Sequence, residues 1–173
     1  MKKTIKTFKV DYVQVLDEHG EVDAKLDPKL SDEELKEIYK KMNLIKVFDK
    51  KGLALQRTGK TGTYIQYVGQ EACQIALTHC LQKDDWCFPS YRETGALIAA
   101  GVPIRNLLLY WGGDSRGMHI ENDINIFPIA VPVSSQTPHA TGAGWAMKLQ
   151  KKKNAAIVTF GDGATSRGDF HSG

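Results

Sequence analysis

The segment from Ala155 to His171 constrains the fold more than any other part of the sequence. Residues 155–160 carry no charge and include two β-branched aliphatic residues and a Phe, which is typical of a strand buried on both faces of a parallel sheet. The strand runs directly into Gly161-Asp162-Gly163, and glycine permits a sharp turn or the close approach of a ligand. We therefore expect an α/β fold with Asp162 just past the carboxyl end of a central strand, where open sheets bind ligands.

Size, charge and cysteine spacing restrict the class of protein. The chain has 173 residues, of which 42% are hydrophobic, so one substantial core and one main domain are expected. Its formal charge is only +3, and we interpret Lys151-Lys152-Lys153 as the solvated end of a helix, so nucleic-acid binding is not expected. Cys73, Cys80 and Cys87 form no Cys-x-x-Cys pair, which indicates buried thiols in a reducing compartment and not disulfides or a zinc site.

The beginning of the sequence indicates an arm followed by a long helix. Met1-Lys2-Lys3 does not precede an apolar run of signal-peptide length, and no stretch approaches membrane-spanning length, so we expect a cytoplasmic chain with no membrane contact. Residues 1–30 mix short apolar pieces with a turn and predict an extended arm that packs on a partner. Ser31 and Glu34 form a capping-box pattern, and apolar residues then recur at helical spacing, so residues 32–56 are predicted to be one amphipathic helix.

The middle of the chain contains a second candidate binding region. Residues 69–82 are predicted to form a helix with Cys73, Ala76, Leu77 and Cys80 on one side, and His79 is interpreted as structural. Trp86 to Phe88 is predicted to be a short buried strand that ends at Pro89, before a helix over residues 93–100. This order places Ser90, Tyr91 and Arg92 at a strand end beside a helix start. A guanidinium there suits phosphate; the alternative is a surface Arg paired with Glu93.

Three further segments precede the final strand. Residues 103–110 predict a helix, and residues 112–119 predict a flexible glycine-rich loop ending at His119, which is either an ordinary loop residue or close to a substrate. Residues 126–133 are apolar, but their two prolines exclude a regular central strand, so their backbone is expected to line a pocket. A helix rich in Gly and Ala is then expected from Pro138 to Lys151.

On spacing alone, Gly-Asp-Gly also suits an ordinary turn. The longer run Gly-Asp-Gly-Ala-Thr-Ser-x-Gly-Asp-Phe-His, however, resembles the first half of the thiamine diphosphate motif in the α subunits of E1 2-oxo acid dehydrogenases, of the pyruvate and branched-chain type. Phe-Pro-Ser-Tyr-Arg-Glu, residues 88–93, is similar to the same family. The resemblance extends from about residue 30 and implies, for residues 31–173, a thiamine diphosphate-binding fold with a mostly parallel sheet flanked by helices. Arg167 replaces the family's usual Glu, and the second, Asn-Asn half of the motif is absent, so we expect an incomplete domain.

The resemblance also implies the roles of individual residues. Asp162 would bind Mg²⁺, which prefers hard oxygen ligands and is usually held by one or two carboxylates plus phosphate oxygens. No catalytic residue is implied, because the family's activating Glu belongs to the β subunit. A monovalent cation is possible near Ser135 and Gln136, although Ala130 replaces a Ser ligand of that site. The residues implied to bind thiamine diphosphate are Ser90, Tyr91, Arg92, Val131, Val133, Asp162, Gly163 and Ala164.

For the activity, the resemblance implies oxidative decarboxylation of pyruvate and transfer of the acyl group to the lipoyl group of an E2 acyltransferase. The implied assembly is an α₂β₂ heterotetramer with an E1 β subunit. One alternative is the α subunit of a branched-chain 2-oxo acid or acetoin dehydrogenase E1. An alternative of another class is a truncated, non-catalytic assembly module that keeps only the interface with β.

Overall fold

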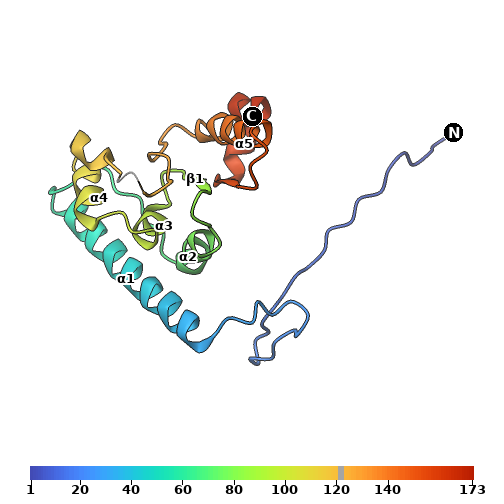
Figure 1. Ribbon diagram of the computed structural model, residues 1–173, viewed down its shortest axis with the longest axis horizontal. Helices are drawn as coiled ribbons and strands as arrows, with labels where there is room; N and C mark the ends of the chain where they lie inside the picture. The colour runs from blue at the N-terminus through green and yellow to red at the C-terminus, as the bar shows by residue number, and fades with distance from the viewer. Residues whose placement is uncertain (121–122) are drawn as a thin grey trace. The chain divides into compact units, whose positions relative to one another are not determined.

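A computed structural model of the protein describes residues 1–120 and 123–173 (Figure 1). It divides into two units, residues 1–36 and residues 37–173. In the first unit no residue is buried, and the regular structure before residue 31 is a single antiparallel bridge between Leu16 and Val22. The carboxylate of Asp17 accepts hydrogen bonds from the backbone N–H groups of His19 and Glu21 and so closes the turn between the bridged residues. This unit therefore has no apolar core of its own.

The long helix α1 spans Asp32–Arg57, as the sequence predicts. Its capping box is confirmed: the Glu34 carboxylate accepts the Ser31 N–H at 2.8 Å, and Ser31 Oγ accepts the Glu34 N–H at 3.3 Å. The buried face of the helix carries a carboxylate, Asp49, beside Ile45 and Phe48. Asp49 Oδ1 accepts the Tyr64 hydroxyl at 2.9 Å and the Tyr67 N–H at 3.3 Å, so a polar cluster ties α1 to the segment that follows it.

The second unit is an α/β fold with many helices and a small parallel sheet. Strand β1 (Trp86–Phe88) pairs in parallel with β2 (Ala156–Val158), and Cys87 lies opposite Ile157. Parallel bridges from Cys87 to Ile126 and from Ser90 to Ala130 place the proline-containing segment along the other edge of β1. The remaining elements are α2 (Glu71–His79), α3 (Thr94–Ala99), α4 (Ile104–Trp111), η1 (Ser115–Met118), α5 (Gln136–Leu149), η2 (Asp162–Ser166) and α6 (Gly168–Ser172).

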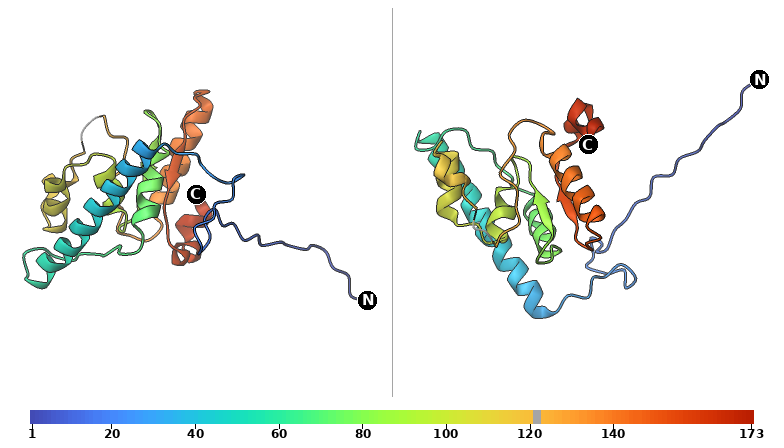
Figure 2. Two further views of the ribbon diagram at one scale, coloured as in Figure 1. Left: turned by 90° about the horizontal axis from the view of Figure 1, so that it is seen from below. Right: turned by 45° about the horizontal axis from the view of Figure 1, so that its top comes forward.

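The sheet lies between two groups of helices. Helix α5 covers one side of β1 and β2, while α2 and α3 lie on the other side (Figures 1 and 2). The main core is on this second side, where α1 and α4 also pack. Its buried residues are Ile45, Phe48, Tyr64, Tyr67, Ile75, Cys87, Leu97, Ile98, Val102, Leu107, Trp111, Ile126 and Ile129.

The predicted apolar face of α2 is wrong. Cys73 and Cys80 are exposed, so of the three cysteines only Cys87 is buried, and burial, with the Glu93 carboxyl nearby, raises the pKa of its thiol to about 12. His79 is also exposed, and it ends a helix that was expected to reach Gln82. The buried face instead carries Gln74, because its amide donates to the Arg92 carbonyl at 3.1 Å and accepts the Ala96 N–H at 3.0 Å.

Other expectations need correction. Strand β2 is only partly buried, because among the described residues it pairs on one edge alone, with β1. Helix α5 begins at Gln136, two residues before the predicted start at Pro138, and a proline is tolerated in a first turn, where its missing N–H would have no partner.

The expected flexible loop over residues 112–119 contains the short helix η1. Its start is capped by Asp114, whose side chain accepts the Arg116 N–H, and Gly117 is packed against the backbone of Tyr110. His119 is exposed, and its carbonyl accepts the Asn106 side chain at 2.8 Å. Elsewhere in the described part of the chain, none of the helices has both the length and the apolar character needed to cross a lipid bilayer.

Candidate functional site

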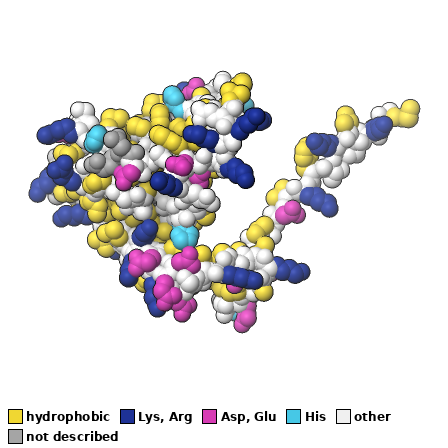
Figure 3. Space-filling view, in the orientation of Figure 1, with side chains coloured by type: hydrophobic (Ala, Val, Ile, Leu, Met, Phe, Trp, Pro, Cys, Tyr) yellow, Lys and Arg dark blue, Asp and Glu magenta, His cyan; other side chains and the backbone are white. Residues whose placement is uncertain are grey.

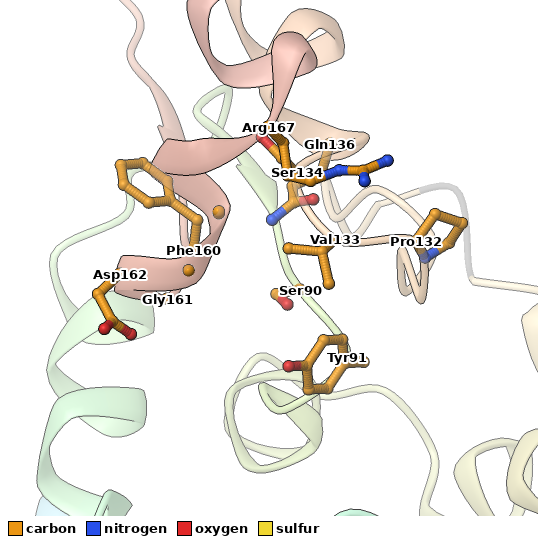
Figure 4. Close-up of a pocket in the computed structure, with 12 residues that line it drawn as sticks. Ser90, Tyr91, Pro132, Val133, Ser134, Gln136, Phe160, Gly161, Asp162 and Arg167 are labelled. Carbon is orange, nitrogen blue, oxygen red and sulfur yellow. The ribbon is translucent and has the colours of Figure 1, made fainter.

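A pocket of about 560 Å³ lies at the carboxyl ends of β1 and β2, beside the start of α5 (Figure 4). Three segments that are far apart in the sequence form its walls. The parallel pairing of β1 with β2 brings two of them to the same edge of the sheet, as expected for an open α/β fold. The lining residues are Ser90, Tyr91, Pro132, Val133, Ser134, Gln136, Phe160, Gly161, Asp162, Gly163, Ala164 and Arg167.

The first wall is the end of β1. The bridge to Ala130 and a hydrogen bond from the Ser90 N–H to Thr159 Oγ1, at 3.2 Å, hold Ser90 on both sides. The Tyr91 hydroxyl points into the pocket, toward the side on which Asp162 lies (Figure 4). Two hydroxyl groups are thus available there for an oxygen-rich ligand.

The second wall is the turn after β2. The turn passes directly into the 3₁₀ helix η2, in which Thr165 Oγ1 donates to the Asp162 carbonyl at 2.7 Å. The Asp162 carboxylate is exposed and accepts no hydrogen bond from any described residue. Gly163 and the small Ala164 complete this wall, so a ligand can come close to the backbone.

The third wall is the segment before α5 together with the first residue of that helix. Ser134 has a φ of 75°, an unusual value for a residue with a side chain, and it is buried. Gln136 is only 1% exposed, and its Nε2 donates to the Thr159 carbonyl at 2.6 Å. Its Oε1 is buried with no partner among the described residues, so one oxygen remains free to bind a ligand or a cation. Ser135 Oγ donates to the Pro132 carbonyl.

Two of the implied cofactor-binding residues lie outside this pocket. The guanidinium of Arg92 donates to the Gln66 carbonyl and does not form the surface pair with Glu93. Arg92 lines a smaller neighbouring pocket of about 130 Å³, which shares Ser90 and Tyr91 with the first. Val131 is 52% exposed and lines neither pocket, whereas Val133 lines the larger one. The structure therefore brings together Ser90, Tyr91, Val133, Asp162, Gly163 and Ala164.

Among the described residues that line the pocket, Asp162 and Arg167 carry the charge. Among the described residues there is no cluster of three or more His, Cys, Asp or Glu side chains that would hold a metal by itself. A single carboxylate nevertheless fits Mg²⁺ that is shared with phosphate, because this ion usually keeps several waters and uses few protein ligands. The donor set is therefore compatible with a metal bound together with a diphosphate.

Comparison with known proteins identifies the family. The model of the family described as "Dehydrogenase E1 component" matches residues 39–173. The chain belongs to this family. The E1 chain is 36% identical over 162 residues to the "Pyruvate dehydrogenase E1 component subunit alpha" of Mycoplasma genitalium, covering 91% of this chain and 44% of that protein.

Two proteins of the same name give a similar result. The identity is 34% over 166 residues for Staphylococcus aureus, covering 95% of the E1 chain and 45% of the relative. It is 37% over 158 residues for Acholeplasma laidlawii, covering 91% and 46%. The E1 chain therefore spans less than half the length of these relatives.

Several lining residues were not among those that the resemblance implied to bind the cofactor. Phe160 and Gly161 precede Asp162, so the motif itself was a usable signal for them, and Arg167 was noted only as a departure from the family. Pro132 belongs to residues 126–133, whose backbone was expected to line a pocket, and it does line this one. Ser134 gave no signal, because its positive φ depends on tertiary structure.

Proposed function

We propose that this E1 chain is the part of a pyruvate dehydrogenase E1 α subunit that holds the diphosphate of thiamine diphosphate through Mg²⁺. The complete enzyme would decarboxylate pyruvate and pass the acyl group to the lipoyl group of E2. The observation that carries the proposal is the meeting of Asp162, Ser90 and Tyr91 around one pocket, although the segments lie about 70 residues apart. The names of the relatives support pyruvate as the substrate.

Each group in the pocket suits a part of the cofactor. The Asp162 carboxylate would bind Mg²⁺, and the hydroxyls of Ser90 and Tyr91 would donate to diphosphate oxygens. Gly163 and Ala164 would let the diphosphate approach the backbone. The main chain at Val133 would contact the aminopyrimidine ring. The main chain at Val131 is proposed to do the same, although Val131 lines neither pocket described above.

The two arginines would act differently. Arg167 adds positive charge to the pocket, which attracts a diphosphate but opposes Mg²⁺. Arg92 lies in the neighbouring pocket, so its side chain would have to leave the Gln66 carbonyl to reach a phosphate. Thiamine, once bound, would supply the electron sink for decarboxylation, while the protein supplies position and charge.

The proposal includes partners. A β subunit would supply the activating acid and form an α₂β₂ heterotetramer in the cytoplasm. Exposed apolar side chains support a protein partner: Trp145 is 65% exposed and Leu149 is 73% exposed on α5, and hydrophobic side chains are visible over this part of the molecule in Figure 3.

The test is a Mg²⁺ titration of thiamine diphosphate binding and pyruvate decarboxylation in the intact protein with its β partner. We expect Asp162→Asn to weaken Mg²⁺-dependent binding roughly tenfold or more, the effect of losing an interaction with a charged group. Asp169→Asn is the matched control, because Asp169 is exposed in the same motif but does not line the pocket. Equal Mg²⁺ dependence in wild type and Asp162→Asn would refute the assignment.

Substrate choice is measured in the same preparation. We expect turnover of pyruvate to exceed that of branched-chain 2-oxo acids and of acetoin. A preference for either of these would move the chain to the corresponding E1 enzyme, whereas assembly with β without cofactor binding would indicate a non-catalytic module.

A further inference from the structure

Thr159 directly precedes the turn after β2 and is hydrogen-bonded to the other two walls of the pocket. Its N–H donates to the Phe88 carbonyl at 3.2 Å and extends the pairing of β2 with β1 by one residue. Its Oγ1 accepts the Ser90 N–H at 3.2 Å, and its carbonyl accepts Gln136 Nε2 at 2.6 Å. A single residue thus connects the end of β1, the start of α5 and the turn that carries Asp162.

The side chain of Thr159 also interacts with the carboxyl group of Glu93, at the start of α3. Burial raises the pKa of this carboxyl, and a hydrogen bond with the Thr159 side chain opposes that effect. A threonine hydroxyl has one proton to donate and lone pairs to accept with. The Ser90 N–H uses one of these lone pairs, so the hydroxyl joins the end of β2 to the end of β1.

The turn that follows depends on this anchor. In the described part of the chain, the hydrogen bonds of residues 160–163 stay inside the turn and η2: the Gly161 carbonyl accepts the Ala164 N–H, and the Asp162 carbonyl accepts Thr165 Oγ1. Thr159 is therefore the last residue before Asp162 that is hydrogen-bonded to distant parts of the chain. We infer that Thr159 is a positioning residue: its hydroxyl, which accepts the Ser90 N–H, fixes the Phe160–Gly163 turn against the end of β1 and so sets the place of Asp162 in the pocket.

The first test needs no ligand. Hydrogen exchange of residues 160–167 is compared in the intact protein for wild type, Thr159→Val, which keeps the shape but loses the hydroxyl, and Thr159→Ser, which restores it. We expect exchange about tenfold faster in Thr159→Val, the size expected from losing a hydrogen bond, and near wild type in Thr159→Ser.

A remote threonine provides the control. Thr58 directly follows α1, and its Oγ1 donates to the carbonyls of Ala54 and Leu55 within that helix. Thr58→Val therefore loses a comparable hydroxyl and should leave the exchange rates of residues 160–167 unchanged. Unchanged exchange in Thr159→Val, faster exchange spread equally over α1, or failure of Thr159→Ser to restore protection would overturn the inference.

The second test rests on the proposed function. Calorimetry with thiamine diphosphate and Mg²⁺ should show affinity about tenfold weaker in Thr159→Val and near wild type in Thr159→Ser. Loss of exchange protection without loss of affinity would overturn the link to the pocket. If wild type itself binds no thiamine diphosphate, the proposed function fails, and the exchange experiment alone decides the role of Thr159.

Discussion

Two polar regions of this molecule are built in opposite ways. Around α1, the carboxylate of Asp49 accepts two hydrogen bonds, and the Tyr67 hydroxyl donates to the Ile45 carbonyl at 2.9 Å. At the pocket, neither the Asp162 carboxylate nor the buried Gln136 Oε1 has a hydrogen-bond partner among the residues that the structure describes. Polar groups that are hydrogen-bonded within the protein stabilise the fold, whereas unpaired polar groups cost stability unless a ligand binds to them. Chemical type alone therefore does not tell which carboxylate serves structure and which serves binding.

The largest expected effect on stability is at Asp49, the hydrogen-bonded carboxylate. Asp49→Ala leaves the Tyr64 hydroxyl and the Tyr67 N–H without an acceptor and should lower the free energy of unfolding by about 2–4 kcal/mol. Urea unfolding measures the change. Asp49→Asn, which keeps one acceptor oxygen, should lose less, and an equal loss in both variants would contradict the hydrogen-bond explanation.

A second test concerns close packing on the same side of the molecule. A Cβ atom at Gly117 would lie 2.2 Å from the Tyr110 backbone nitrogen, so Gly117→Ala should cost about 1–3 kcal/mol of stability through overpacking. Gly142→Ala is the matched control, because a Cβ there meets nothing within 4 Å, and alanine is favoured over glycine inside a helix. Equal thermal midpoints for the two variants would show that η1 yields easily.

A smaller, pH-dependent effect on stability is expected at Glu93, the residue that precedes α3. Burial raises the pKa of this carboxyl above its usual value of 4.5, so the folded chain keeps a proton that the unfolded chain has lost. The wild-type free energy of unfolding should therefore fall as pH rises from about 4 through the raised pKa, and stay lower above it.

Glu93→Gln cannot titrate, so it should gain stability relative to wild type at about pH 8 but not at about pH 4. Denaturant unfolding at both pH values provides the measurement. Glu33→Gln, at an exposed position in the first turn of α1, is the control. A gain of the same size at both pH values would exclude the ionisation of Glu93 as its cause.

The smallest expected effect on stability is at Asp162, the exposed carboxylate of the pocket. Asp162→Asn should change the free energy of unfolding by less than about 0.5 kcal/mol, because the side chain is exposed and no described residue is hydrogen-bonded to it. The same variant is the one expected to lose Mg²⁺-dependent binding. A large loss of stability on urea unfolding would remove the contrast with Asp49.

The sequence predicted the features that depend on local chemistry. The capping box of α1, the strand at Trp86 and the strand before Asp162 depend on neighbouring residues, and each was found where expected. The predicted face of α2 is wrong because Gln74 is buried through hydrogen bonds to Ala96 of α3 and to the Arg92 carbonyl, which a hydrophobic pattern does not reveal. At the site, the turn at Asp162 was predictable from its glycines. The direction of the Arg92 side chain was not, because it depends on the Gln66 carbonyl, which is distant in the sequence.

The parallel pairing of β1 with β2 has a consequence for how the chain folds. Trp86 and Ala156 pair across about 70 residues, so the sheet forms only after a long loop has closed. The conformational entropy of this loop is lost before the strands make contacts that offset the loss. Helix α1 and its cap involve only near neighbours and do not wait for this step. The pocket exists only where β1 and β2 end together, so it should be among the last parts of the molecule to form. A newly made chain would thus acquire its helices well before it acquires a place for a ligand.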